Sequence, residues 1–525
     1  METCRKNWRI GIDVGGTNTD AVIIDENLKL VASIKTSTTE DVMSGIERSM
    51  HAVLSQIGED RQRIGYAMLG TTHCTNAIVE RKHLNKVCVI RLGAPATTAV
   101  KPMADWPDDI KQAMQVKSFI VEGGNEFDGR EISPLDEDKI HEIAGWIRDN
   151  EMESAAVVAV FSPVSDEHEK RTMQILKEEL GEAFPVTISS EIGSVGLLER
   201  ENAAILNAAL VRVARTTAES FTKALERENI TDVAVYLGQN DGTLMSVDYA
   251  KRYPILTIAC GPTNSIRGAS FLTEKKDAFV VDVGGTTTDV GVLSNGFPRE
   301  SMIAVEIGDI RTNFRMPDLV SIGLGGGTLV KVQPDGTVEI GPESVGYRVT
   351  EEALCFGGST LTATDIVVAL GKAPGVGDPA KVAHLDPALL EQAYGKMKTM
   401  VETCIDEMKT SSGDIEVILV GGGSILVPHE LEGASEVLLP EHFGVANAIG
   451  SAIAQVSGQI EKVFSLENTT REAALQEAKE LAVEEAISAG AAPESVEIID
   501  IEYVPLAYLG SAVRIRVKAV GNLIA

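Results

Sequence analysis

Cysteine is scarce and scattered in this sequence. The six cysteines (Cys4, Cys74, Cys88, Cys260, Cys355 and Cys404) form no C-x-x-C pair. Paired cysteines are typical of zinc sites, iron–sulfur clusters and small disulfide frameworks. We therefore expect six reduced thiols with structural roles.

Long apolar runs are also missing. AAVVAVF at 155–161 is among the longest, whereas a helix that spans a bilayer needs about 20 apolar residues. The first residues, METCRKNWRI, contain no apolar signal core. We therefore expect a cytoplasmic protein with no membrane association.

Positive charge and aromatic side chains are in short supply. The chain has 47 Lys and Arg against 77 Asp and Glu, a formal net charge of −30. A chain this acidic repels phosphate backbones, so we expect no nucleic-acid partner. Aromatic residues make up only 4% of the chain, while glycine is abundant at 48 residues, a composition that favours tight backbone turns over stacking surfaces.

An internal repeat organises the 525 residues, a length that predicts two to four domains at about 100 to 200 residues each. IDVGGTNTDAVII at 12–24 returns as VDVGGTTTDVGVL at 281–293. Each copy is an apolar run, a Gly-Gly-Thr turn and a second apolar run, which predicts a strand, a turn and a strand. Two such hairpins predict duplicated α/β lobes.

Other segments fit the same α/β class. Apolar runs of strand length and long segments of helical periodicity alternate along the chain. Predicted strands lie at 66–70, 86–92, 155–161, 186–189, 233–238 and 416–424, and predicted helices at 137–149, 167–180 and 197–227. We expect three parts: a first lobe at 1–195, a second lobe at 196–464, and a small α-β-β segment at 465–525.

The glycine turns are candidate phosphate-binding sites. Consecutive backbone N–H groups in such a turn can form an anion-binding concavity, and we expect glycine to be required for its positive φ and for lack of bulk. Asp13 and Asp282 end the strands that enter the turns, where a carboxylate can hold Mg²⁺ or orient water. A third cluster, GGGS at 421–424, follows the apolar strand EVILV.

This combination resembles the phosphate 1, phosphate 2 and adenosine motifs of the sugar kinase, hsp70 and actin superfamily. The resemblance implies two ribonuclease-H-like lobes with Mg²⁺ and ATP bound in the cleft between them. The nucleotide-binding residues expected on this basis are Gly15, Gly16, Thr17, Asn18, Gly284, Gly285, Thr286, Thr287, Gly421, Gly422 and Gly423.

A narrower resemblance covers most of residues 8–460. LGTTHCTNAIVERK, ERENAAILNAAL, CGPTNSIRGASFL and RTNFRMPDLVSIGLGGGT are similar to segments of the hydantoinase A and 5-oxoprolinase family, its shorter members in particular. The family implies ATP-dependent activation of the carbonyl of a cyclic amide, such as a hydantoin, 5-oxoproline or another lactam, followed by hydrolytic ring opening. It also implies a second, B-type hydrolytic subunit, to which no segment here is similar; a homo-oligomer is a further expectation.

Candidate catalytic residues are Asp13, Asp282, Thr72, His73 and Glu80. Thr72 follows a predicted strand but equally fits a helix N-cap. His73 is a candidate base, against the alternative of a structural hydrogen bonder. Glu80 forms an i, i+4 pair with Asn76 that faces either the cleft or solvent. The charged run at 199–202, which opens the 197–227 helix, is typical of a surface.

Related functions remain open. A ketone carboxylase subunit uses the same chemistry on the carbonyl oxygen, and a small-molecule kinase transfers the same phosphoryl group. An ATP-driven switch such as a reductase activator needs cysteine ligands for an iron–sulfur cluster, which the scattered cysteines disfavour.

Overall fold

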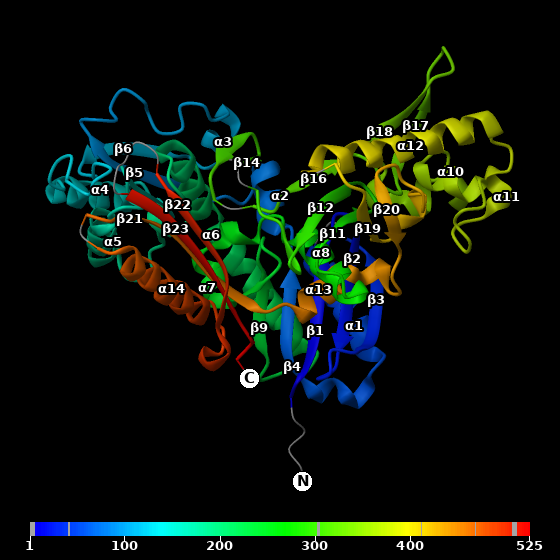
Figure 1. Ribbon diagram of the computed structural model, residues 1–525, viewed down its shortest axis with the longest axis horizontal. Helices are drawn as coiled ribbons and strands as arrows, with labels where there is room; N and C mark the ends of the chain where they lie inside the picture. The colour runs from blue at the N-terminus through cyan, green and yellow to red at the C-terminus, as the bar shows by residue number, and fades with distance from the viewer. Residues whose placement is uncertain are drawn as a thin grey trace, which may run out of the picture.

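The structure is a computed structural model of the chain, and it describes residues 6–39, 42–301, 305–314, 316–410, 412–467, 469–506 and 512–524. The predicted α/β class is confirmed. Its strands form two large sheets, one smaller inserted sheet and two hairpins (Figure 1).

The first large sheet contains nine strands in the order β22-β23-β21-β10-β9-β4-β1-β2-β3. Strands β1 and β2 form the first predicted hairpin, and β4 and β9 continue the sheet in parallel with β1. The bounds are β1 (Trp8–Val14), β2 (Asn18–Ile24), β3 (Leu30–Ser37), β4 (Ile64–Gly70), β9 (Ala234–Gly238), β10 (Leu244–Ser246), β21 (Val456–Ser465), β22 (Glu497–Pro505) and β23 (Ala512–Gly521).

The second large sheet repeats the core of the first. Strands β11 and β12 form the second hairpin, β16 pairs with β12, and β19 and β20 continue in parallel with β11. The order β16-β12-β11-β19-β20 therefore matches β3-β2-β1-β4-β9, so the sequence repeat is a structural repeat of ribonuclease-H-like lobes. The bounds are β11 (Ala278–Val283), β12 (Thr288–Ser294), β13 (Phe297–Pro298), β16 (Leu319–Ile322), β19 (Ile415–Val420) and β20 (Ala434–Leu438).

A third sheet is inserted in the first lobe between β4 and helix α6 (Leu197–Arg227). Its four strands are parallel, in the order β6-β5-β7-β8. The bounds are β5 (Val87–Ala94), β6 (Lys117–Glu122), β7 (Ser154–Ala159) and β8 (Val186–Ile188), with helices α3 (Asp108–Ala113), α4 (Glu137–Asp149) and α5 (Glu167–Leu180).

Helix α6 joins the inserted sheet to the first lobe. Its N-terminal half packs with Val89 and Val158 of the inserted sheet, and its C-terminal half packs with the core under β1. The charged run at 199–202 was expected at the surface, and this prediction is wrong. Arg200, Glu201 and Asn202 are buried. Their burial is possible because each is paired, as when Glu201 accepts two hydrogen bonds from Arg91, at 2.7 and 2.6 Å.

Two short helices cross where the lobes meet, α8 (Cys260–Thr273) and α13 (Ala446–Ile453), near the centre of Figure 1. Glycines allow their backbones to touch. A Cβ on Gly268 would lie 1.8 Å from the Ala446 carbonyl oxygen, and a Cβ on Gly450 would lie 1.8 Å from that of Asn264. This close crossing fixes α8 against both sheets.

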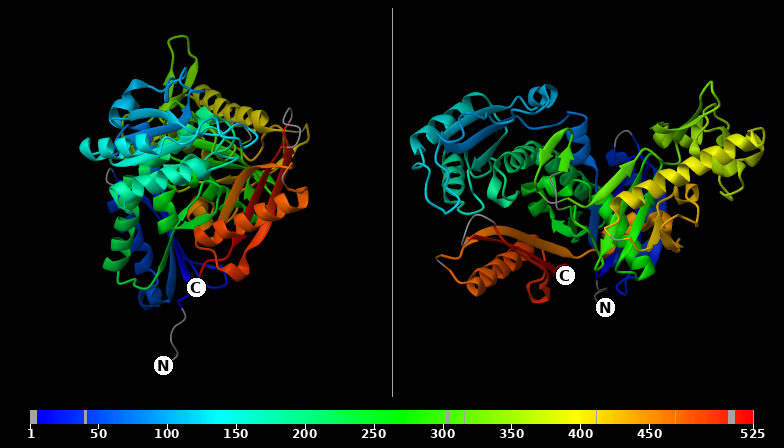
Figure 2. Two further views of the ribbon diagram at one scale, coloured as in Figure 1. Left: turned by 90° about the vertical axis from the view of Figure 1, so that its left-hand side faces the viewer. Right: turned by 45° about the horizontal axis from the view of Figure 1, so that its top comes forward.

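The C-terminal segment has the predicted α-β-β order, α14 (Arg471–Ser488), β22 and β23. It extends the first sheet, because β23 pairs with β21 along the whole strand. Buried alanines at every fourth position of α14 (Ala474, Ala478, Ala482 and Ala486) let the helix lie close to that extension, beside the inserted sheet (Figure 2). The division at 195 and 464 stays a prediction; strands from all three predicted parts share this one sheet.

The remaining elements surround the two lobes. Helix α1 covers the first sheet, while α10 and α12 cover the second. The bounds are α1 (Val42–Ser55), α2 (His73–Val79), α7 (Val247–Arg252), α9 (Val349–Glu352), α10 (Ala363–Ala369), α11 (Pro379–Val382), α12 (Pro387–Met408), β14 (Val305–Ile307), β15 (Ile310–Thr312), β17 (Thr328–Val332) and β18 (Val338–Ser344).

Five cysteines are buried free thiols, as expected, and Cys4 lies outside the described residues. Among the described helices, none has the length and apolarity needed to cross a membrane.

Candidate functional site

The two aspartates of the repeat occupy equivalent positions. Asp13 pairs across the first hairpin with Asp20, and Asp282 pairs across the second with Asp289. Each hairpin turn is closed by the same hydrogen bond, from Gly15 N–H to Asn18 O and from Gly284 N–H to Thr287 O, both 2.9 Å. The repeat is therefore conserved down to the hydrogen bonding of its turns.

The two turns meet at the junction of the lobes. Thr17 Oγ1 and Thr286 Oγ1 lie 3.2 Å apart. Within the described residues, the N–H groups of Gly16, Thr17, Gly285 and Thr286 donate no hydrogen bond. The facing turns thus present the kind of unpaired donors that bind phosphate oxygens.

The expectation that the turns need glycine for its positive φ is wrong for the two hairpin turns. None of Gly15, Gly16, Gly284 and Gly285 has a positive φ; in the third cluster Gly421 does, at 86°. Close contacts account for three of the four turn glycines, because a Cβ on Gly15 or Gly284 would lie 3.2 Å from the carbonyl oxygen of Asn18 or Thr287. A Cβ on Gly285 would lie 2.4 Å from Thr17 Cγ2, while a Cβ on Gly16 would meet nothing within 4 Å. Gly16 is exposed and borders the space where a phosphate would sit.

Asp13 is buried and held by two amides. Its oxygens accept hydrogen bonds from Asn264 Nδ2 at 2.9 Å and from Asn447 Nδ2 at 3.0 Å, which come from α8 and α13. Burial, together with the nearby carboxylates of Asp20 and Asp282, raises the pKa of Asp13 to about 6, although the two amide hydrogen bonds lower it. The carboxylates of Asp13, Asp20 and Asp282 therefore lie close together, with Lys35 as a nearby positive charge.

Asp282 is held by the next residue of the same helix, since Ser265 Oγ donates to it at 2.5 Å. Burial raises the pKa of Asp282, and Lys35 opposes this effect. Lys35 lies on β3, forms a 2.7 Å ion pair with Asp20, and its Cε would be 3.7 Å from a Cβ on Gly422. Lys35 thus joins the first lobe to the third glycine cluster, a role that its isolated position in the sequence did not indicate.

A glycine follows or ends the strand beside each aspartate. A Cβ on Gly70, at the end of β4, would lie 2.1 Å from Asp13 Oδ1, and a Cβ on Gly421, after β19, would lie 2.2 Å from Asp282 Oδ1. A Cβ on Gly423 would come within 2.6 Å of the Gly284 carbonyl oxygen. All three predicted glycine clusters therefore converge on the two aspartates.

The candidate bases lie at different distances from this centre. Thr72 is the N-cap residue of α2 by position, without a side-chain capping bond. His73 begins α2, and its Nδ1 is hydrogen-bonded to Thr71 Oγ1, next to Gly70. Glu80 is exposed at the other end of α2, where it pairs with Lys82. The structure brings His73 toward the aspartates and leaves Glu80 at the surface.

The start of α8 supports both aspartates, a role that the sequence pattern did not indicate. Asn264 and Ser265, in the first turns of this helix, donate from their side chains to Asp13 and Asp282. Cys260 is also close, because Thr71 N–H donates to its sulfur at 3.4 Å. The adjacent polar residues near the start of this helix are the feature that could have indicated this.

The donor set fits Mg²⁺ bound together with phosphates. Among the described residues no group of three or more His, Cys, Asp or Glu side chains forms a cage for a metal. Mg²⁺ usually binds through one or two carboxylates and completes its octahedron with water and phosphate oxygens. The buried carboxylates of Asp13 and Asp282 match that requirement.

Gly16→Val is expected to weaken Mg-ATP binding at least about tenfold while leaving the fold intact, because the new side chain would fill only the open space beside the turn. Titration calorimetry of the variant, with Gly145→Val on open space of α4 as the control, tests this. Gly285→Val should in addition lower the melting temperature, since it presses on Thr17. Unchanged ATP affinity in Gly16→Val would contradict the turn as a phosphate site.

The fold and the paired turns define a two-lobed α/β protein in which each lobe carries the same hairpin turn. The model of the hydantoinase/oxoprolinase N-terminal region matches residues 9–180, and the hydantoinase/oxoprolinase model matches residues 200–375. Together the matches cover more than half of the chain. The chain belongs to the hydantoinase/oxoprolinase family.

Named relatives have different reactions. The gamma subunit of acetophenone carboxylase from Aromatoleum aromaticum is 26% identical over 390 residues, covering 69% of this chain and 53% of that subunit. The alpha subunit of caprolactamase from Pseudomonas jessenii is 24% identical over 391 residues, covering 70% of this chain and 55% of the subunit. The chain thus matches about half the length of these curated relatives.

The whole fold has a solved counterpart. The structure of the ATP-dependent caprolactamase from Pseudomonas jessenii aligns with a TM-score of 0.75 at 19% identity, covering 98% of this chain and 88% of that one. Because the alignment covers 98% of this chain, it includes the C-terminal strands of the first sheet.

Proposed function

We propose that the chain is the ATP-using component of an amidohydrolase, which activates the carbonyl of a cyclic amide for hydrolytic ring opening. Hydantoins, 5-oxoproline and other lactams are the substrate class. The observation that carries the proposal is the pair of equivalent aspartates behind two facing turns with unpaired N–H groups. The family and its ATP-dependent caprolactamase member support the choice of reaction.

Each part of the site has a chemical task in this proposal. Bound ATP would supply a phosphoryl group to the carbonyl oxygen of the ring. The N–H groups of Gly16, Thr17, Gly285 and Thr286 would hold phosphate oxygens, and Asp13 and Asp282 would hold Mg²⁺. Asn264 and Asn447 keep the Asp13 carboxylate in place by donating to its two oxygens, so its position does not depend on the ligand.

A carboxylase subunit is the second candidate, favoured by the similarity to the acetophenone carboxylase gamma subunit. Activation of a ketone as its enol phosphate and activation of an amide place the phosphoryl group on the same kind of oxygen. The two reactions therefore share the nucleotide site and differ in the organic substrate.

The test is phosphate release from Mg-ATP by the purified chain in the presence of hydantoin, 5-oxoproline, a six- or seven-membered lactam, acetone or acetophenone. We expect a cyclic amide to stimulate release at least about fivefold and the ketones to have no effect. Stimulation by a ketone alone would replace the proposal by its second candidate, and stimulation by none of them would contradict both. Thr17→Val, which keeps the shape but removes the hydroxyl that contacts Thr286, serves as the site control.

A further inference from the structure

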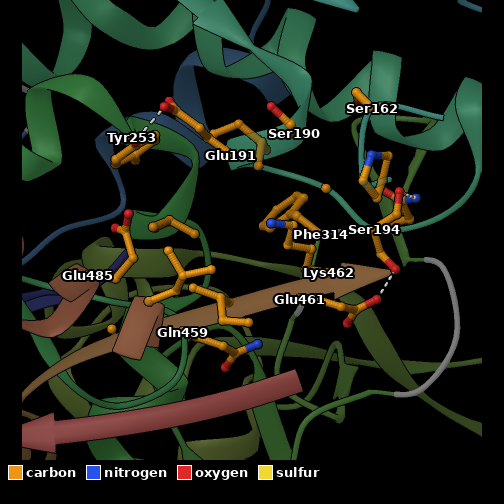
Figure 3. Close-up of a pocket in the computed structure, with 18 of the residues that line it drawn as sticks. Ser162, Ser190, Glu191, Ser194, Tyr253, Phe314, Gln459, Glu461, Lys462 and Glu485 are labelled. Atoms are coloured by element: carbon orange, nitrogen blue, oxygen red, sulfur yellow. Dashed lines mark hydrogen bonds between the residues drawn. The ribbon is translucent and has the colours of Figure 1, made fainter. Parts of the chain in front are cut away.

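Two cavities of the molecule differ in the charges that line them. The first, of about 440 Å³, is lined by the segments after β7 and β8 and by β21, and its lining includes the carboxylates of Glu191, Glu461 and Glu485 (Figure 3). The second, of about 320 Å³, has Arg9 and Arg267 as its only charged lining among the described residues, so we call it the arginine pocket. Its volume lies in the range of about 300 to 1,000 Å³ that is typical of small-ligand sites.

The two arginines have no carboxylate partner within the described residues, although the chain carries 77 Asp and Glu. Asp241 is close enough to act on Arg267, but it already forms a 2.9 Å ion pair with Lys518. Burial lowers the pKa of Arg267 to about 10 against the effect of Asp241, so the guanidinium remains charged at neutral pH. A partly buried cation without a counter-ion is destabilising, so the pocket favours an anionic ligand.

Both guanidinium groups are held by a carbonyl oxygen and an aromatic ring. Arg9 Nη1 donates at 3.2 Å to a carbonyl near the C-terminal end of α13, and Arg9 Cζ lies 5.8 Å from the centre of the Tyr66 ring. Arg267 Nη1 donates to a carbonyl in the turn between β12 and β13, and Arg267 Cζ lies 4.2 Å from the centre of the Phe297 ring. The two charges are therefore positioned before a ligand binds, which lowers the entropy cost of binding.

The arginine pocket lies toward the opposite end of β1 from the aspartate site. Arg9 is four residues before Asp13 on β1, about 13 Å at 3.3 Å per residue. Helices α8 and α13 reach both places. Their Asn264 and Asn447 hold Asp13, and their residues also form wall of the pocket, as Arg267 does from α8. The pocket is thus separate from the paired turns but is built on the same two helices.

We propose that the arginine pocket binds a small organic carboxylate with an apolar body. After the bonds to carbonyl oxygens, each arginine keeps a terminal nitrogen, Nη2, that bonds to no described residue and, unlike Arg267 Nε, is not buried. One such donor from each arginine matches the two oxygens of a carboxylate. Leu28, Phe271 and Leu523 supply apolar wall for the rest of the ligand. Such binding is independent of the reaction proposed above.

Titration of the unaltered chain with benzoate, and with benzamide as its neutral counterpart of the same shape, tests the charge of the ligand. We expect benzoate to bind with a Kd below about 10 mM and benzamide at least about tenfold more weakly, because it cannot form charge-assisted hydrogen bonds with both arginines. Inorganic phosphate should displace benzoate only weakly. Equal binding of benzamide, no binding of benzoate, or tighter binding of phosphate would each overturn the proposal.

Variants of the two arginines test the place of binding. Arg9→Met and Arg267→Met remove the charge and keep most of the side-chain length, and each should weaken benzoate binding about tenfold or more without changing that of benzamide. Arg215→Met is the matched control, because Arg215 is exposed on α6 and does not line the pocket. Circular dichroism establishes that each variant is folded. Unchanged benzoate affinity in both pocket variants, or an equal loss in the control, contradicts the site.

A variant that keeps both arginines gives an independent test. Leu28→Trp should abolish benzoate binding by filling the pocket, whereas Val31→Trp, at a 40% exposed position of β3 outside the pocket, should not. Asp13→Ala should bind benzoate like the unaltered chain, and Mg-ATP should not displace it. Benzoate binding that survives Leu28→Trp, or that is lost in Asp13→Ala and displaced by Mg-ATP, would place the anion elsewhere and overturn the pocket while leaving the proposed function standing.

Discussion

Asp13→Ala and Asp282→Ala are each expected to slow ATP hydrolysis by about 100-fold or more. Loss of a metal ligand or of a group that stabilises a transition state has effects of this size. Phosphate release at saturating Mg-ATP measures the change. Asp248→Ala is the control, because that carboxylate is 95% exposed and pairs only with a lysine one turn away. Undiminished turnover in either site variant would remove both aspartates from the proposed chemistry.

A second measurement, the pH dependence of the free energy of unfolding, tests the buried environment of Asp13. The pKa of Asp13 is about 6 in the folded chain and 3.8 for a free carboxyl, so between these pH values the folded state binds more protons than the unfolded state. The contribution of Asp13 to the free energy of unfolding therefore falls as pH rises from about 4 to 6. Above pH 6 this contribution is constant.

Asp13→Asn has no proton to lose at this position, so its stability relative to the unaltered chain should rise over the same interval. The gain above pH 6 should stay below about 3 kcal/mol, at about 1.4 kcal/mol per pKa unit, because asparagine can accept from only one of the two amides. Urea unfolding of both proteins from pH 4 to 8 measures this difference. A difference that is flat with pH would contradict the assigned environment of Asp13.

Ring opening is expected to require a second polypeptide. Activation makes the amide carbon electrophilic, but water still needs a base or a metal-bound hydroxide, which contributes about 10²- to 10⁴-fold. In the proposed function the paired turns bind phosphate oxygens and Mg²⁺, so the group that activates the water would come from elsewhere. The relatives named above are themselves subunits.

Chromatography of the ring-opened product measures this, with the chain alone and with the product of a neighbouring gene. We expect slow ATP hydrolysis and no product from the chain alone, and at least about a 100-fold gain with the partner. Efficient ring opening by the chain alone would place the base within it, and His73→Ala would then be the first variant to make, with exposed His51→Ala as its control.

Local pattern predicted the parts of the fold that depend on local geometry. The two hairpins and the 137–149, 167–180 and 197–227 helices lie where periodicity placed them, because a strand or an amphipathic helix is encoded by neighbouring residues. The equivalence of Asp13 and Asp282 followed from the repeat for the same reason.

What the sequence could not show depends on contacts between distant segments. In the sequence, Glu201 has the pattern of an exposed charge on a helix. Its burial depends on Arg91 of the inserted sheet, which donates to it. The role of Lys35 depends on two distant contacts: β3 pairs with β2, and Lys35 lies near the third glycine cluster. One pocket of the molecule is lined by the segments that follow β7 and β8, by the β9–β10 loop and by β21, and no single stretch of sequence contains it.

The contact between Thr17 and Thr286 has a consequence in terms of symmetry. Two identical half-sites related by a twofold axis would bind an asymmetric ligand equally well in two opposite orientations. The half-sites here differ: Gly16 has free space where Gly285 is pressed against Thr17. Asp13 is held by two amides, whereas a hydroxyl from Ser265 holds Asp282. These differences make the two orientations unequal in energy, so a pair of turns that began as copies can select a single direction for a ligand that itself has two different ends.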